Sequence, residues 1–300
     1  MASAVLAELV AAMRAGGVDF SDLEKGRADL EALLAGMPAD PDLTYTRTEL
    51  GGVPTLAINS GPADAGALLY LHGGAYIAGS TQGYRGLVAE IGKLLGLPAY
   101  APDYRLAPEA PFPAAVDDAV AAYRALLDRG IPAHRIIVAG DSAGGGLALA
   151  TLVKLKADGA ALPAAGFMIS PWADLSCSVA TMASKAAEDP SLERAGLLQS
   201  AGLYLAGQDA DHPLASPVNA DLSGLPPLLV QVGSAEILLG DSLLIADRAG
   251  QAGTHIQLEV WPDMIHVWHS FHFMLPEGRQ ALDAAGQFLR ARLAAGPISR

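Results

Sequence analysis

The sequence has one cysteine, few basic residues and no long apolar run, and each of these scarcities excludes a class of protein. Cys177 alone cannot form an internal disulfide, which is typical of a reducing cytosol. The formal net charge of −13, from 32 acidic and 19 basic residues, argues against nucleic acid or an anionic membrane surface as a partner. No uninterrupted apolar stretch is long enough to span a bilayer, so we expect no stable membrane insertion.

We expect no secretory signal at the start of the sequence, and we detect no internal repeat or low-complexity linker. No basic residue precedes the short apolar stretch near the start, and Glu8 and Arg14 interrupt that stretch. Hydrophobic residues make up 51% of 300 residues, enough for a large buried core around one sheet. We therefore expect a globular α/β protein located in the cytoplasm.

Apolar runs alternate with helical patterns along most of the chain. This order is typical of a mostly parallel sheet covered by helices on both faces. We predict eight strands, near residues 43–49, 53–58, 67–71, 99–103, 136–139, 166–169, 228–232 and 256–261. We predict helices between and after them, near residues 83–94, 115–128, 142–156, 242–252 and 278–294.

Two segments do not follow this alternation. Residues 1–42 contain two stripes of apolar residues at helical spacing, and residues 175–212 also favour helix without a strand. The remaining ranges, 43–174 and 213–300, form the two parts of the predicted α/β core.

A serine lies where a predicted strand meets a predicted helix. The motif Gly140-Asp141-Ser142-Ala143-Gly144 follows an apolar run and opens a helix-forming stretch. A serine on such a sharp turn forms a nucleophile elbow, and the small residues on either side allow the strand and helix backbones to approach closely. We predict that Ser142 is a catalytic nucleophile.

A glycine-rich motif upstream predicts an oxyanion hole. His72-Gly73-Gly74-Ala75 ends an apolar run about 70 residues before the serine. Glycines leave backbone N–H groups free to point at a ligand, and such donors stabilise the oxyanion that forms when serine attacks an ester. The candidate donors are the amides of Gly73, Gly74, Ala75 and Ala143. The alternative is a simple glycine turn after a buried strand.

A serine needs a base to remove its proton and a carboxylate to orient that base. His266 is the candidate base, because it follows a late strand and the turn-forming Pro262-Asp263. His269 and His272 follow at three-residue spacing and are interpreted as packing or surface residues. A metal site at these three histidines is the alternative, but no cysteine or carboxylate pattern supports it, so we expect no metal and no cofactor.

Two carboxylates compete for the role of the triad acid. Glu236 emerges three residues after Gly233, which ends the strand run that starts at Leu228, and this places it well to reach a histidine on the neighbouring loop. Asp241 directly precedes an apolar-periodic stretch, as a helix N-cap would. We favour Glu236 and keep Asp241 as the alternative.

Together these motifs resemble the hormone-sensitive-lipase-like branch of the α/β-hydrolases, the bacterial family IV esterases. The likeness runs from about residue 68 to 266 and includes Asp103-Tyr104-Arg105-Leu106-Ala107-Pro108-Glu109. It implies an α/β-hydrolase fold, with residues 1–42 and 175–212 joining as a cap over the active site. His266 and Glu236 match the family's base and acid positions. Ala75 stands where the family usually has a third glycine, and alanine disfavours positive φ.

The predicted function is hydrolysis of short- to medium-chain, mainly apolar carboxylic esters through an acyl-enzyme. A small-molecule ester is the expected partner, and a homodimer is left open. Hydrolysis of lactones, amides or formamides by the same triad is one alternative. A noncatalytic ligand receptor on the same fold is another.

Overall fold

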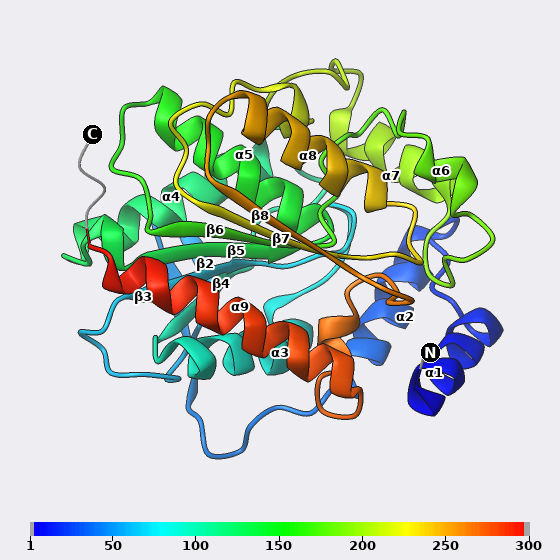
Figure 1. Ribbon diagram of the computed structural model, residues 1–300, viewed down its shortest axis with the longest axis horizontal. Coiled ribbons are helices and arrows are strands. Elements are labelled where there is room, and N and C mark those ends of the chain that lie inside the picture. Colours follow the sequence, from blue (N-terminus) through cyan, green and yellow to red (C-terminus); the bar gives the residue numbers. More distant parts are fainter. Residues whose placement is uncertain (1–2, 297–300) are drawn as a thin grey trace.

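The computed structural model describes residues 3–296, and within that range an eight-stranded sheet forms the centre of the molecule (Figure 1). The strands are β1 (Tyr45–Leu50), β2 (Val53–Ile58), β3 (Ala67–Leu71), β4 (Ala99–Pro102), β5 (Ile136–Asp141), β6 (Ala165–Ile169), β7 (Leu228–Gly233) and β8 (Ile256–Trp261). Their order is β1-β2-β4-β3-β5-β6-β7-β8. β2 pairs antiparallel with β1 and β4, and the other pairs are parallel. The predicted mostly parallel, eight-stranded sheet is confirmed.

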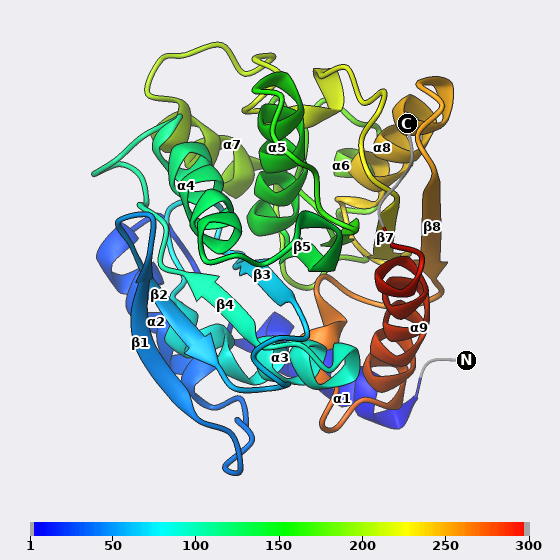
Figure 2. The same ribbon diagram turned by 90° about the vertical axis from the view of Figure 1, so that its left-hand side faces the viewer.

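Helices cover both faces of this sheet (Figure 2). On one face lie α3 (Thr81–Leu95) and α9 (Pro276–Ala294); on the other lie α4 (Ala114–Asp128), α5 (Ala143–Ala157) and α8 (Leu239–Gln251). Each corresponds to a predicted helix, and α8 begins three residues earlier than predicted. Short 3₁₀ helices are η1 (Ala133–Arg135), η2 (Pro217–Asn219) and η3 (Trp268–Phe271).

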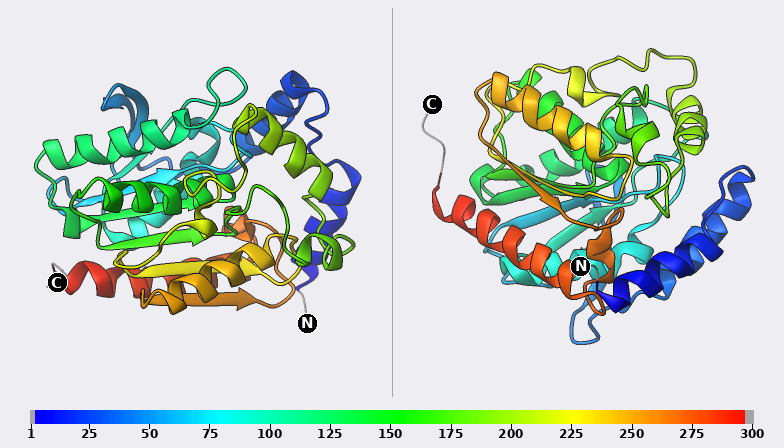
Figure 3. Two further views of the ribbon diagram at one scale, coloured as in Figure 1. Left: turned by 90° about the horizontal axis from the view of Figure 1, so that it is seen from above. Right: turned by 45° about the vertical axis from the view of Figure 1, so that its right-hand side comes forward.

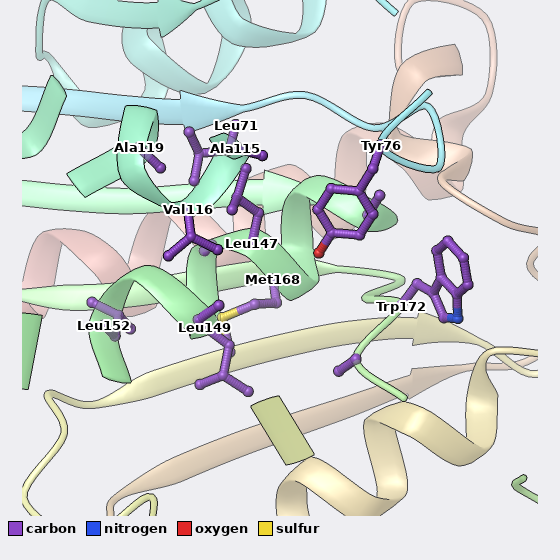
Figure 4. Packing of buried hydrophobic residues seen from close by; sticks show 14 of the residues in the cluster. Leu71, Tyr76, Ala115, Val116, Ala119, Leu147, Leu149, Leu152, Met168 and Trp172 are labelled. Carbon is purple, nitrogen blue, oxygen red and sulfur yellow. The ribbon is translucent and has the colours of Figure 1, made fainter. Parts of the chain in front are cut away.

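The central strands are apolar on both sides because helices cover both faces. Every residue of β3, β5, β6 and β7 is buried. Figure 4 shows the packing on one face, where Leu71 and Met168 of the sheet meet Val116 of α4 and Leu147 of α5. Burying each large apolar side chain contributes about 1.5–3 kcal/mol. This core fixes the strand ends from which the candidate site is built.

The two segments that break the alternation lie close together in space. They contribute α1 (Ala4–Ala15), α2 (Leu23–Ala35), α6 (Thr181–Ser184) and α7 (Arg194–Leu205), which gather beyond the ends to which the strand arrows point (Figure 3). Arg14 of α1 donates to the carbonyl oxygen of Ala187 at 2.9 Å, which joins the two segments directly. Their role as a cap stays a prediction.

Arginine side chains secure the loops around the candidate site. Arg27 of α2 pairs with Glu109 at 2.8 Å and donates to the carbonyl oxygen of Ile77 at 2.6 Å. Arg105 pairs with Asp118 at 2.7 Å. The first forty residues are therefore held against the loop that follows β3.

Candidate active site

Ser142 occupies the turn between β5 and α5, as the sequence predicts. Its φ is +54° and its ψ is −124°, a conformation that L-residues rarely adopt. Its N–H donates to the carbonyl oxygen of Ile169 at 2.9 Å, and the residue is 8% exposed. Strained backbone of this kind costs about 1–3 kcal/mol and is concentrated at functional sites.

Glycine is required on both sides of Ser142. A Cβ at Gly140 would lie 2.2 Å from the carbonyl oxygen of Gly144, and a Cβ at Gly144 would lie 2.0 Å from that of Leu71. No real Cβ tolerates such distances to backbone. The predicted close approach of strand and helix backbones at this turn is confirmed.

His266 and Glu236 are brought together by the loops after β8 and β7. His266 Nδ1 lies 2.8 Å from Glu236 Oε2, the Glu236 side chain is fully buried and the His266 side chain is 10% exposed. A carboxylate accepts, so Nδ1 carries the proton in this pair and Nε2 is left as an acceptor. A base needs this tautomer to take a proton from serine.

Ser170 is a residue of the site that the sequence analysis missed. At the carboxyl end of β6, its hydroxyl donates to Glu236 Oε1 at 2.8 Å and accepts the N–H of Val267 at 3.2 Å. The N–H of Gly233 donates to the same carboxylate oxygen at 2.7 Å. The signal that could have revealed it is position, because polar residues at the carboxyl ends of parallel strands line the site in open α/β sheets.

The carboxyl end of β6 is also the link between Ser142 and His266. Ile169 accepts the N–H of Ser142, and the next residue, Ser170, accepts the N–H of Val267, which follows His266. Within residues 3–296, Ser142 Oγ and His266 form no hydrogen bond. Catalytic hydrogen bonds are often long before substrate binds, and they tighten in the substrate complex.

Asp241, the alternative acid, has different partners. Its Oδ1 accepts the N–H groups of Ala173 and Asp174, each at 2.9 Å. It is not the N-cap that the sequence indicated: α8 begins at Leu239, so Asp241 lies inside the first turn and binds a different loop. Burial raises the pKa of Asp241 to about 8, against hydrogen bonds from those two amides.

The glycine-rich loop after β3 offers free amides at only some of the predicted positions. The N–H of Gly73 donates to Asp141 Oδ1 at 3.0 Å and is therefore occupied. The N–H groups of Gly74, Ala75 and Ala143 have no acceptor in the described part of the chain. Ala75 adopts a φ of +53°, the left-handed conformation that glycine would adopt more readily.

Asp141 joins this loop to the elbow from within the core. Besides the N–H of Gly73, its Oδ1 accepts the hydroxyl of Tyr70 at 2.8 Å. Burial raises the pKa of Asp141 to about 6, although the Tyr70 hydrogen bond and the charge of His266 favour ionisation. The buried carboxylate therefore fixes the position of the loop relative to Ser142.

Three carboxylates set the electrostatics of the candidate base. Burial lowers the pKa of His266, but the hydrogen bond and charge of Glu236, with the charges of Asp189 and Asp141, outweigh burial and raise that pKa above its usual value. An imidazolium formed during reaction would be stabilised by the same groups.

The other two histidines are not brought to the site. His269 Nε2 lies 2.8 Å from the side-chain oxygen of Gln231 and is buried, and His272 Nδ1 lies 3.0 Å from the carbonyl oxygen of His269. No group of three or more metal-binding side chains is found in the part of the chain that the structure describes.

Aromatic side chains pack where the glycine-rich loop meets the segment 175–212. Tyr76 stacks on Tyr204 of α7 with ring centroids 4.0 Å apart and lies 6.2 Å from Trp172 (centroid to centroid). All three are buried, and Figure 4 shows Tyr76 and Trp172 beside one another. This packing ties the loop of the predicted oxyanion hole to α7.

The chain is similar to known proteins over most of its length. A family model described as alpha/beta hydrolase fold matches residues 68–270. A crystal structure of an esterase from the bacterial hormone-sensitive lipase family superposes with a TM-score of 0.93 at 44% identity, covering 98% of this chain and 100% of that one. The chain belongs to the hormone-sensitive-lipase-like esterases of the α/β-hydrolase fold.

Other members of the family are similar over most of their length. An acetyl-hydrolase of Streptomyces hygroscopicus is 52% identical over 78% of each chain. An esterase of Acinetobacter venetianus is 34% identical over 87% of each. The protein is thus an esterase of this family. No helix among the described residues is both long and apolar enough to cross a membrane.

Proposed function

We propose that this esterase is a serine carboxylesterase that works through an acyl-enzyme. Ser142 Oγ attacks the ester carbonyl and passes its proton to His266 Nε2, while Glu236 fixes the imidazole tautomer and stabilises its charge. His266 then protonates the leaving alcohol, and water repeats the sequence to release the acid. The observation that carries the proposal is the 2.8 Å hydrogen bond between His266 and Glu236, on a loop that binds the same end of β6 as the strained turn of Ser142.

The free amides of Gly74, Ala75 and Ala143 are the proposed donors to the oxyanion. Each preorganised donor is worth about 3 kcal/mol of transition-state stabilisation. The amide of Gly73 is left out because Asp141 accepts its hydrogen. Gly73 therefore shapes the loop, and its neighbours would bind the charge.

The proposed substrates are short- to medium-chain, mainly apolar esters. Two observations support this class: the similarity to the acetyl-hydrolase of Streptomyces hygroscopicus, and the likeness to EstE5, solved after soaking with p-nitrophenyl butyrate, at a TM-score of 0.93 and 42% identity over 98% of this chain and all of EstE5. We further propose that residues 1–42 and 175–212 act as a cap that excludes water from this site.

A substrate panel tests this proposal. p-Nitrophenyl esters of increasing acyl length, a lactone and matched anilides are compared, with Ser142→Ala as the blank. We expect the highest kcat/KM on short esters and a loss of about 10⁴-fold or more in Ser142→Ala. Anilides cleaved faster than the matched esters would assign the enzyme to amide hydrolysis, and turnover by Ser142→Ala would refute the proposed nucleophile.

A cytoplasmic location and a homodimer stay predictions. The location rests on the single cysteine of the sequence, Cys177, which is buried and cannot form an internal disulfide. Fractionation of the producing cells and sedimentation of the purified protein would test the two separately.

A further inference from the structure

Asp189 connects the segment 175–212 to the backbone beside the candidate acid. Its Oδ2 accepts the N–H of Ile237, the residue after Glu236, at 2.8 Å. Its Oδ1 accepts the N–H groups of Ser191 and Leu192 at 2.8 and 3.0 Å, which turns the chain towards α7. The residue is 8% exposed, so these contacts are shielded from water.

Thr181 of α6 binds the other side of the same residue. Its hydroxyl donates to the carbonyl oxygen of Ile237 at 2.7 Å and accepts the N–H of Gly240 at 2.9 Å. Ile237 is fully buried, and a buried backbone group without a partner is costly. Both polar backbone groups of Ile237 therefore depend on side chains from the segment 175–212.

The position of Ile237 matters because its backbone is bonded to that of Glu236 and so determines where the Glu236 side chain starts. On the preceding side, the N–H of Ala235 donates to the carbonyl oxygen of Met264 at 3.0 Å. On the following side, Asp189 and Thr181 provide the corresponding anchors. The Glu236 carboxylate lies between them and must reach His266 with one oxygen, so a shift of either anchor would move the hydrogen bond that orients the base.

We propose that Asp189 and Thr181 are positioning residues that clamp Ile237 and thereby hold Glu236 against His266. The triad geometry then depends on how the segment 175–212 is seated. The same segment carries Tyr204, which stacks on Tyr76 directly after the glycine-rich loop. The segment therefore contacts both the loop of the proposed oxyanion hole and the loop that carries Glu236. The inference rests on the proposed triad.

Charge distinguishes the two clamp residues. The acidic groups acting on His266 are Glu236 from the loop after β7, Asp189 from the segment 175–212 and Asp141 from β5. The charge of Asp189 contributes to the raised pKa of His266, whereas Thr181 carries no charge. A residue that only stabilises the fold would leave the pH profile of hydrolysis unchanged, so this profile is the decisive readout for Asp189. For the uncharged Thr181, the decisive readout is whether the conservative Thr181→Ser variant restores the kcat that Thr181→Val loses.

The test compares Asp189→Asn, Thr181→Val and Thr181→Ser, using 4-nitrophenyl acetate as the probe. Ser200→Ala is the matched control, because Ser200 is a buried hydroxyl of α7 that donates within its own helix, to Gly196 at 3.0 Å. For each variant, kcat, KM, the pH profile of kcat/KM and the unfolding midpoint in urea are measured.

For Asp189→Asn we expect kcat to fall about tenfold or more, since one amide N–H group loses its carboxylate acceptor. In the pH profile of kcat/KM, the midpoint of the acidic limb should also move to lower pH, because removing a negative charge near His266 lowers the pKa of His266. Thr181→Val should lower kcat without moving that midpoint, and Thr181→Ser should restore kcat. Ser200→Ala should change stability alone.

An unchanged kcat in Asp189→Asn or Thr181→Val would overturn the proposed clamp. A loss of kcat in the control Ser200→Ala as large as in these two variants would overturn it as well. If Asp189→Asn does not fold, the pair Thr181→Val and Thr181→Ser decides. Failure of the clamp would leave the wild-type enzyme hydrolysing esters through Ser142. Failure of the proposed function would instead appear as turnover in Ser142→Ala, so the two outcomes are distinct.

Discussion

The hydroxyl of Ser170 donates to the Glu236 carboxylate at 2.8 Å and accepts the backbone N–H that follows His266 at 3.2 Å. One small side chain thus contacts the candidate acid and the loop of the candidate base together. Strand β6 neighbours β7, whose loop carries Glu236, and the loop after β8, one strand further along the sheet, reaches back to the end of β6 through the N–H of Val267. The acid and base loops are held in register by the sheet itself.

Ser170→Ala should therefore reduce catalysis by more than it reduces stability. A hydrogen bond to a charged group is worth about 1.5–3 kcal/mol, so we expect kcat to fall about tenfold to a hundredfold. Steady-state kinetics on 4-nitrophenyl acetate and urea unfolding measure the two effects. A wild-type kcat in a folded Ser170→Ala would show that Ser170 does not support the triad.

Glu236→Gln should be much more damaging than any change at Asp241. The glutamine keeps the shape of the side chain but disturbs the tautomer of His266, and the corresponding change in serine proteases lowers kcat by about 10⁴-fold. Asp241→Ala should leave kcat near that of the wild type and lower the free energy of unfolding, since it removes the acceptor of two amides. Equal losses of kcat in both variants would contradict the assignment of the acid.

The sequence was sufficient to predict the sheet because the signals for its strands are local. Each strand is an apolar run bounded by turn residues, and the order of strands and helices limits the topology to few choices. The elbow at Ser142 was predictable for the same reason, since its motif, strand and helix are contiguous. His266 and Glu236 each follow a predicted strand, and the resemblance to the family supported both.

Contacts between distant residues could not be predicted in this way. Ser170 and Glu236 are 66 positions apart, and Asp189 and Ile237 are 48 apart. Serine, threonine and aspartate occur at many turns, so nothing local distinguishes these from ordinary turn residues. The occupied amide of Gly73 was hidden for a related reason, because its acceptor Asp141 lies on another strand.

Ala75→Gly should stabilise the fold. Ala75 has a φ of +53°, and the left-handed conformation costs an L-residue about 1–2 kcal/mol that glycine avoids. Part of the gain is offset because glycine has more freedom in the unfolded chain, so we expect a net rise of about 1 kcal/mol or less in the free energy of unfolding. Esterase activity should be retained, since the N–H remains. A lower urea midpoint would contradict a strained Ala75.

Asp241→Asn should remove a pH dependence of stability. The folded-state pKa of Asp241, about 8, lies above the ordinary value of 3.8, so the folded protein holds a proton that the unfolded chain releases. This contribution to stability is complete below about pH 4 and is lost as pH rises towards 8. The asparagine side chain of this variant would keep one acceptor oxygen without titrating. The wild type should therefore lose stability relative to the variant between pH 5 and 8, as measured by urea unfolding; parallel curves would contradict the raised pKa.

The most direct test of the account is to find where the acyl group resides during turnover. The enzyme is mixed rapidly with 4-nitrophenyl acetate, quenched in acid, digested and analysed by mass spectrometry, with Ser142→Ala treated in parallel. We predict a burst of nitrophenol and an acetyl group on the peptide that contains Ser142, both absent from the variant. Hydrolysis at the wild-type rate by Ser142→Ala, or an acetyl group trapped on another residue that the reaction requires, would contradict it.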